Sequence, residues 1–350
     1  MDIADFSSGI QERIRKVLQN EELKNLCLRE RTREDFDDIL STSLKVASVD
    51  VSDIHENNLL ISDVNLFAPG QIKNDIIEFY TLLDNLDPNG INLVNRIKAN
   101  SKYVRLKPKF LGERSYCFSG RDKNGNKLQE IFINLEGRIG DADTAIHEVC
   151  HSCCPQFMEC VGPKDKRVGE IPAVITDHLS TNFLKKKYPQ FAENFLESDK
   201  LGQKLNIKKA RECVFDALFI KVMCGEVSLE EVLQKYGNMF NDFPSILLDK
   251  LRDVEMNAYK PFYEYSYLVP QAIALEMADR AKDQPKLVAK QLKGIIKDNN
   301  KLTEDQILDL LCLPQKNELL DNYVSKFQER IKKINEEQQF LTDNNPNPVA

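Results

Sequence analysis

Two of the four histidines in this 350-residue sequence lie four positions apart, in the segment DTAIHEVCHSCC at residues 143–154. On a helix, His147 and His151 are one turn apart and project from the same face, so both imidazoles can reach one metal ion. Glu148 is rotated by about 100° from His147, which lets it face a water on the ion without being a ligand. This H-E-x-x-H arrangement is typical of a zinc site with a general-base glutamate.

A glutamate further along the chain has the spacing of a third ligand. Glu170 follows His151 by nineteen residues, which gives the pattern H-E-x-x-H-x18-E. Catalytic zinc sites use three protein ligands and leave a fourth position open, and two histidines with one glutamate form a known set. Asp177 lies seven residues beyond Glu170, two helical turns on, where it can accept the second N–H of a ligating histidine. The sequence therefore predicts Zn²⁺ bound by His147, His151 and Glu170, with Asp177 as their support.

Other residues of the same types carry weaker signals. A histidine pair on an ordinary core helix is the alternative interpretation of HEVCH. His178 faces away from Glu170 on the second helix and is expected to make a structural hydrogen bond, whereas His55 lies in a polar stretch with no partner in sequence. The cysteine cluster could itself bind zinc, but its spacing lacks the paired C-x-x-C of structural zinc sites; its members are Cys150, Cys153, Cys154 and Cys160.

The segments that position these residues are mostly helical. Apolar residues at spacings of three and four predict helices through residues 1–100, and the pattern is helical again from Gly140 to about residue 340. We expect metal-binding helices at 141–154 and 169–187 and a tyrosine-rich helix at 263–281. Asp141 and Asp143 suit the N-terminus of the first of these helices, Pro155 closes it, and Pro172 fits the first turn of the second.

Strand character is confined to residues 102–136. The runs RSYCFSG and LQEIFINL flank Asn124-Gly125, a strong hairpin-turn signal, and YVRLKPKFL precedes them. We expect a mainly α (α+β) fold with a small antiparallel sheet before the first metal-binding helix. An exposed edge on LQEIFINL could pair with an extended peptide.

The chain contains no repeat and no low-complexity linker. One interpretation is a single compact domain. The other divides the chain into a helical N-terminal region at 1–100, a core at 101–285, C-terminal helices at 286–340 and a disordered tail at 341–350.

Composition narrows the classes of function. With 42% hydrophobic and 29% charged residues and no long apolar run, the chain has the composition of a globular protein without a membrane span. A net charge of −7 argues against nucleic acid as the main partner. The N-terminus lacks the pattern of a secretory signal, so the nine cysteines are expected to be reduced in the cytoplasm. The polar C-terminal segment, KINEEQQFLTDNNPNPVA, leaves open export without a leader.

The metal motif resembles the gluzincin metallopeptidases, and most closely the thimet-oligopeptidase-like family. In that family the second helix carries Glu-x-Pro-Ser-Gln with another acid seven residues after the ligand. This chain has Glu170-Ile171-Pro172-Ala173-Val174 and then Asp177, so the glutamate, the proline and the later acid match, whereas the Ser-Gln pair does not. No G-x-M-E-N-like stretch is present, which argues against the aminopeptidase branch with the same spacing.

A downstream segment extends the resemblance to roughly residues 140–285. YEYSYLVPQAIALEMADRA, at 263–281, is similar to the family's YYSYLWAEALA over residues 265–268. The resemblance implies that Tyr267 stabilises the oxyanion of the reaction, with Tyr263 or Tyr259 as alternatives. The family's histidine and glycine before these tyrosines are absent, and Lys260 replaces a further family tyrosine. The chain is also much shorter than typical family members.

Together, motif and resemblance predict a zincin-like metallopeptidase domain. The expected activity is that of a zinc-dependent endopeptidase on peptides or a protein target, with Glu148 as general base. The expected partners are peptide or protein substrates, with neither nucleic acid nor a membrane. Two alternatives remain: a helical binding or scaffold protein with a non-catalytic zinc site, and a zinc hydrolase of non-peptide amides or esters.

Overall fold

The computed structural model describes residues 3–49, 68–108, 115–135, 140–160 and 168–344 of the chain. The chain forms two compact units, Met1–Asp50 with Lys204–Leu268, and Val51–Gln203 with Val269–Ala350. This division differs from the predicted ranges, because each unit combines two segments that are far apart in the sequence. His55 lies outside the described residues. The prediction of a mainly helical fold with a small sheet is confirmed.

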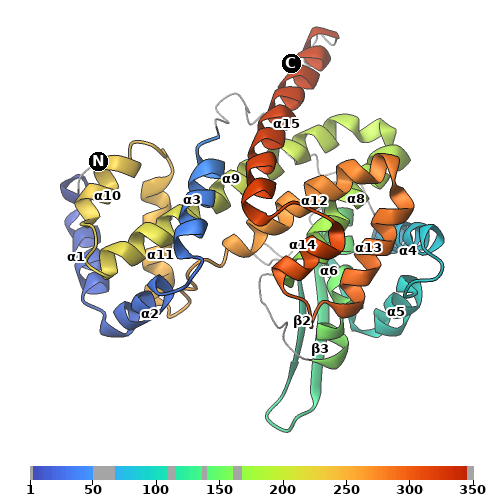
Figure 1. The fold of residues 1–350 in the computed structure, drawn as a ribbon, viewed down its shortest axis with the longest axis horizontal. Coiled ribbons are helices and arrows are strands. Elements are labelled where there is room, and N and C mark those ends of the chain that lie inside the picture. The colour runs from blue at the N-terminus through green and yellow to red at the C-terminus, as the bar shows by residue number, and fades with distance from the viewer. Residues whose placement is uncertain (1–2, 50–67, 109–114, 136–139, 161–167, 345–350) are drawn as a thin grey trace. The chain divides into compact units, whose positions relative to one another are not determined.

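Over its described residues the first unit contains helices joined by turns and no strand. Its core contains large aromatic side chains, including Phe36, Phe215 and Phe243. Ser228 and Glu231 form a capping box at the start of one of its helices, which satisfies amides that the helix itself leaves unpaired. Its elements are η1 (Ile3–Asp5), α1 (Ser8–Leu18), α2 (Glu21–Arg31), α3 (Phe36–Ala47), α10 (Leu229–Tyr236), α11 (Phe243–Glu255), the later part of α9 (Ala192–Met223) and the start of α12 (Tyr265–Asp283) (Figure 1).

The second unit holds the sheet and the predicted metal-binding helices. Its last helix includes residues 341–344, which the sequence assigns to the frayed tail, and residues 345–350 lie outside the described chain. Besides the rest of α9 and α12, its elements are α4 (Pro69–Leu86), α5 (Leu93–Asn100), η2 (Ser101–Tyr103), β1 (Val104–Pro108), β2 (Tyr116–Arg121), β3 (Lys127–Leu135), α6 (Gly140–Cys153), α7 (Pro155–Glu159), α8 (Ile171–Lys187), η4 (Pro189–Phe191), α13 (Pro285–Asp298), α14 (Glu304–Leu311) and α15 (Lys316–Asn344).

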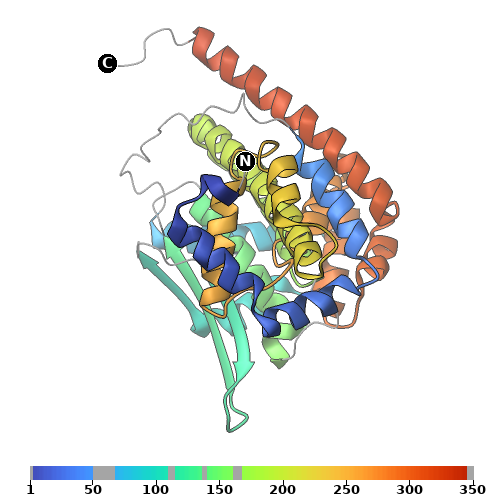
Figure 2. The same ribbon diagram turned by 90° about the vertical axis from the view of Figure 1, so that its left-hand side faces the viewer.

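The three strands form a mixed sheet in the order β1-β3-β2. The predicted hairpin joins β2 and β3: Gly125 has a φ of 81°, its amide donates to the carbonyl of Asp122, and the carboxylate of Asp122 accepts from the amides of Asn124 and Asn126. This hairpin extends beyond the helices of its unit (Figures 1 and 2). The prediction of an antiparallel sheet is wrong for β1, which runs parallel to β3. A turn signal fixes only strands that are adjacent in sequence, and β1 has none.

β3 lies between the other two strands, which bears on the predicted peptide-binding edge of LQEIFINL. β1 pairs with residues 131–135 on one edge, and β2 pairs with residues 127–132 on the other. Each edge of this strand is therefore covered in part, and an exposed edge along its full length is excluded. Its second half is instead a core strand, in which Ile131, Ile133 and Leu135 are buried, and it packs against α6. In the described sheet, β2 is one of the two outer strands.

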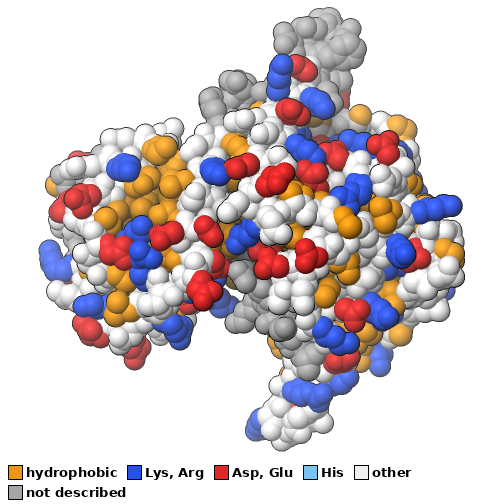
Figure 3. Space-filling model, in the orientation of Figure 1, with side chains coloured by type: hydrophobic (Ala, Val, Ile, Leu, Met, Phe, Trp, Pro, Cys, Tyr) orange, Lys and Arg blue, Asp and Glu red, His pale blue; other side chains and the backbone are white. Residues whose placement is uncertain are grey.

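No helix among the described residues is both long and apolar enough to cross a membrane. On the visible face of each unit, acidic and basic side chains are interspersed (Figure 3).

Candidate metal centre

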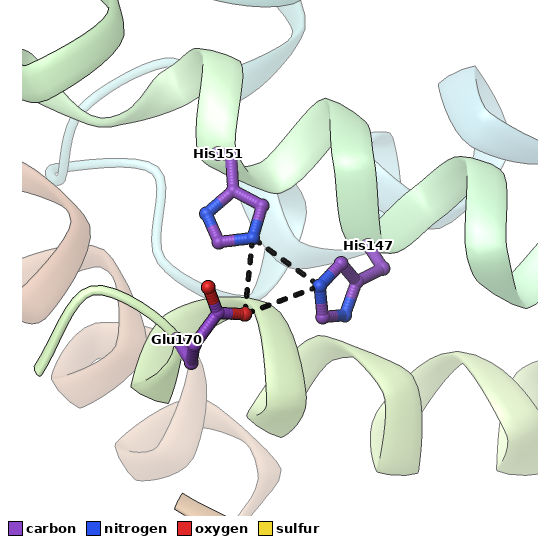
Figure 4. Close-up of side chains that lie close together, drawn as sticks. All are labelled: His147, His151 and Glu170. Carbon is purple, nitrogen blue, oxygen red and sulfur yellow. Dashed lines mark hydrogen bonds and ion pairs between the residues drawn. The ribbon is translucent and has the colours of Figure 1, made fainter. Parts of the chain in front are cut away.

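Two packed helices of the second unit carry the predicted ligands. α6 and α8 begin and end within two residues of the ranges expected from sequence. Ala145, Ile146 and Val149 are buried on α6, so the helix is fixed by its apolar side while His147 and His151 project together from another side (Figure 4). Glu170 is the N-cap residue of α8.

The side chains of His147, His151 and Glu170 converge on one point. The Nε2 atoms of the two histidines are 3.2 Å apart, and Oε2 of Glu170 lies 3.5 Å from Nε2 of His147 and 3.4 Å from Nε2 of His151. Zinc bonds to nitrogen and oxygen are about 2.0–2.1 Å long, so ligand atoms of a tetrahedral ion are about 3.3–3.4 Å apart. The three separations bracket this value. Among the described residues, these three side chains form the one group of three or more histidine, cysteine or acidic residues with metal-binding spacing.

The supporting carboxylate lies where the sequence predicts it. Oδ2 of Asp177 is 2.9 Å from Nδ1 of His147. This contact favours the tautomer with its proton on Nδ1, which leaves the lone pair of Nε2 directed at the convergence point.

Without a metal ion, only protons on the imidazoles can offset the charge of Glu170. The two Nε2 atoms and Oε2 of Glu170 lie within 3.5 Å of one another, and the buried Oε2 makes no hydrogen bond to any described residue. Burial by itself would lower the pKa of His147, but Asp177 and then Glu170 outweigh it and the pKa is raised. For His151, burial again opposes and Glu170 prevails, so its pKa is also raised. Burial alone would raise the pKa of Glu170, yet the histidines lower it. The donor set therefore fits a divalent ion such as Zn²⁺.

Glu148, the predicted general base, follows His147 on α6 and is buried. Burial raises the pKa of its carboxyl group, although the two neighbouring histidines act in the opposite direction. A raised pKa suits a carboxylate that must take up a proton near neutral pH.

Asp143 has a position that the sequence does not reveal. We expect it to cap α6, but its carboxylate accepts hydrogen bonds from Ser180 Oγ at 2.7 Å and Thr181 Oγ1 at 3.1 Å, both on α8. Burial raises the pKa of Asp143 to about 7. The contact joins the two ligand-bearing helices one turn before His147. The one signal in the sequence is that Asp143 precedes His147 by one helical turn, so the two residues share a helix face.

The remaining histidine and the cysteines have no place in the cluster. Nε2 of His178 lies 2.9 Å from Oε1 of Gln271, which confirms the prediction of a structural hydrogen bond. The cysteines form no metal-binding group with other described residues. Of the cysteine cluster singled out in the sequence, Cys150, Cys153 and Cys154 are buried as free thiols.

The predicted oxyanion donors lie in the first unit, and their catalytic roles stay predictions. The hydroxyls of Tyr263 and Tyr267 are 3.5 Å apart. Nζ of Lys209 lies 3.9 Å from the centre of the Tyr267 ring. The hydroxyl of Tyr259 donates to Asp216 at 3.0 Å.

Solved structures of peptidases share this fold. The chain is similar to PZ peptidase A with a bound inhibitor (TM-score 0.53, 16% identity, 74% of this chain and 49% of that chain). It is also similar to a putative oligoendopeptidase F (0.54, 13%, 77% and 49%) and to a putative oligoendopeptidase F from Bacillus anthracis (0.53, 16%, 94% and 57%). Neither a protein-family model nor a curated protein sequence matches the chain.

These likenesses establish the architecture of the chain. It has the mainly helical fold of the oligoendopeptidase F and PZ peptidase structures. It spans about half the length of those chains.

Proposed function

We propose that this chain is a zinc-dependent peptidase of the gluzincin class, with the metal ion held by His147, His151 and Glu170. One observation carries the proposal: three ligand atoms from α6 and α8 lie 3.2–3.5 Å apart, which is the spacing of a tetrahedral zinc site. The fold shared with structures named as peptidases supports the choice of reaction.

Each residue of the site has a specific task in peptide hydrolysis. A bound Zn²⁺ would lower the pKa of a water in its open position toward neutrality and polarise the scissile carbonyl. Glu148 takes a proton from the attacking water and delivers it to the leaving amine, and its raised pKa favours the first transfer. Asp177 keeps the proton of His147 on Nδ1. By the resemblance, Tyr267 donates a hydrogen bond to the developing oxyanion.

The proposed substrate class is supported by the sheet as well as by the ligand cluster. β2 is an outer strand and packs against both α6 and α7. An extended peptide that added to β2 would gain main-chain hydrogen bonds beside the helix that carries Glu148. We therefore assign peptides or an unfolded protein segment as substrate, cleaved at an internal bond.

The test compares wild type with Glu148→Gln, which keeps the size of the side chain but removes its ability to accept a proton. Both proteins are assayed for bound zinc and for cleavage of a denatured protein mixture. We expect one zinc per chain in both and a loss of cleavage of about 10²- to 10⁴-fold in the variant. His178→Gln is the matched control, since His178 is a histidine outside the cluster, and it should cleave at the wild-type rate.

Two results would contradict the proposal. Equal cleavage by wild type and Glu148→Gln would show that the activity does not arise at this site. Zinc binding without cleavage of any peptide would favour the scaffold protein, or, where ester substrates are hydrolysed instead, the non-peptide hydrolase.

A further inference from the structure

A buried carboxylate in the first unit has no part in the mechanism above. Asp216 on α9 is fully buried and accepts from three donors. These are Nζ of Lys250 at 3.4 Å, the hydroxyl of Tyr259 at 3.0 Å and the backbone amide of Phe262 at 3.0 Å. Burial removes the water that would solvate a carboxylate, and hydrogen-bond donors must replace it. The three donors around Asp216 do so, and they fix the carboxylate and its partners relative to one another.

The backbone that Asp216 holds is in an unfavourable conformation. Asn257 and Phe262 have φ values of 54° and 57°, in the left-handed region. For a bulky side chain such as Phe262 this region is disfavoured, because Cβ approaches the following carbonyl oxygen. No glycine occurs between Asn257 and Tyr267 to relieve it. Such strain persists only where surrounding contacts enforce it, and it is found preferentially at functional sites.

Packing fixes Phe262 from the other side. Its ring makes an edge-to-face contact with Phe36 at 5.7 Å between ring centres. The guanidinium of Arg33 lies 5.7 Å from the centre of the same ring. The N-terminal helices of the first unit thus help to hold this backbone in place.

One face of α9 contacts both ends of residues 257–267, which we name the tyrosine segment. Lys209, Glu212 and Asp216 are spaced by three and four residues and so share a helix face. Lys209 lies over the ring of Tyr267 at one end of the segment, whereas Asp216 accepts from Phe262 in its middle and from Tyr259 toward its other end. Glu212, between them, lies 3.7 Å from Lys250 and supports the cation that Asp216 also contacts.

We infer that Asp216 is the positioning residue of the tyrosine segment: it enforces the left-handed backbone at Phe262 and so sets the places of Tyr263 and Tyr267. Its effect on cleavage rests on the proposed function, in which Tyr267 acts on the oxyanion. Its effect on the segment itself does not.

The direct test is hydrogen exchange of the full chain, read on peptides that cover the tyrosine segment. Asp216→Asn replaces one acceptor oxygen by a donor, so at least one of the three hydrogen bonds is lost. We expect exchange of the segment to accelerate about 10-fold or more. Asp75→Asn is the matched control, because Asp75 is equally buried and accepts from Nζ of Lys187 and the hydroxyl of Tyr188, but from no strained amide. It should leave the segment unchanged.

Kinetics give the second readout. Misplacing a transition-state donor lowers kcat at unchanged KM, and a displacement of about 1 Å can cost about 100-fold in rate. We expect Asp216→Asn to lower kcat about 10- to 100-fold with KM and zinc content unchanged. Tyr259→Phe removes one of the three hydrogen bonds and no charge, so it should accelerate exchange of the segment by a smaller factor. Its exchange answers the question where Asp216→Asn does not fold.

The outcomes separate this inference from the proposed function. The positioning role of Asp216 is overturned if hydrogen exchange of the tyrosine segment is unaltered in the folded variants, or if Asp75→Asn lowers kcat as much as Asp216→Asn does. Where Glu148→Gln retains full cleavage, the proposed function fails, and the exchange comparison alone still decides whether Asp216 positions the segment.

Discussion

Replacing Asp177 by asparagine removes the negative charge that holds the Nδ1–H of His147, while a neutral acceptor of similar shape remains. The carboxylate lies 2.9 Å from that nitrogen, within the range of a charged hydrogen bond. Without the charge, Nε2 becomes a weaker donor to the metal ion and its tautomer is less firmly set. We therefore expect Asp177→Asn to bind Zn²⁺ less tightly than the wild type.

The size of the effect follows from the exposure of the two partners. A hydrogen bond to a charged group contributes about 1.5–3 kcal/mol. The side chain of Asp177 is 31% exposed and that of His147 is 17% exposed, so water replaces part of the lost interaction and the lower value applies. About 1.5 kcal/mol corresponds to a roughly 10-fold rise in the dissociation constant.

Competition with a chromophoric chelator at pH 7 measures this change. Asp199→Asn is a suitable control: it removes the same charge in the same unit, where Asp199 pairs with Lys185 at 2.6 Å and not with a ligand. The control should bind zinc within about twofold of the wild type. Equal zinc affinity in wild type and Asp177→Asn would refute the assignment of Asp177 as the support of His147.

Two further predictions concern proton binding and the hairpin. The pKa values of His147 and His151 are raised, so their contribution to the stability of the metal-free protein is complete below about pH 6.5 and is lost as the pH rises through the folded values. The melting temperature of the metal-free protein should therefore fall in that window. Zinc should bind more tightly as the pH rises, and calorimetry in two buffers should detect the protons released on binding. Gly125→Ala should cost about 1 kcal/mol in urea unfolding, since φ is 81° and nothing else obstructs the added methyl. Gly202→Ala, equally unobstructed but inside α9, should raise stability by up to about 1 kcal/mol. Changes in the free energy of unfolding that have the same sign in both variants would contradict this reasoning.

Local geometry made the convergence of His147, His151 and Glu170 predictable from the sequence. Once HEVCH is helical, the spacing of four residues places His147 and His151 on one face whatever surrounds them. Glu170 and Asp177 follow similarly from the start and the period of the second helix. The hairpin was predictable for the same reason, because Asn124-Gly125 acts on residues adjacent in sequence.

Features that depend on distant residues were not predictable. The parallel pairing of β1 with β3 has no local signal, and it decides that LQEIFINL is a central strand. The partners of Asp143 lie 37 and 38 residues away in the sequence. Those of Asp216 lie 34 to 46 residues away. The spacing between Asp143 and His147, and that between Asp216 and Lys209, is visible in the sequence. The sequence does not show which residues either carboxylate contacts.

The contact of Asp143 with Ser180 and Thr181 joins α6 and α8 through side chains other than the proposed metal ligands. On the proposed function, the protein would therefore stay folded when a chelator removes the ion, in contrast to small zinc modules whose folding is their metal binding. A metal ion would then enter a site that is already formed.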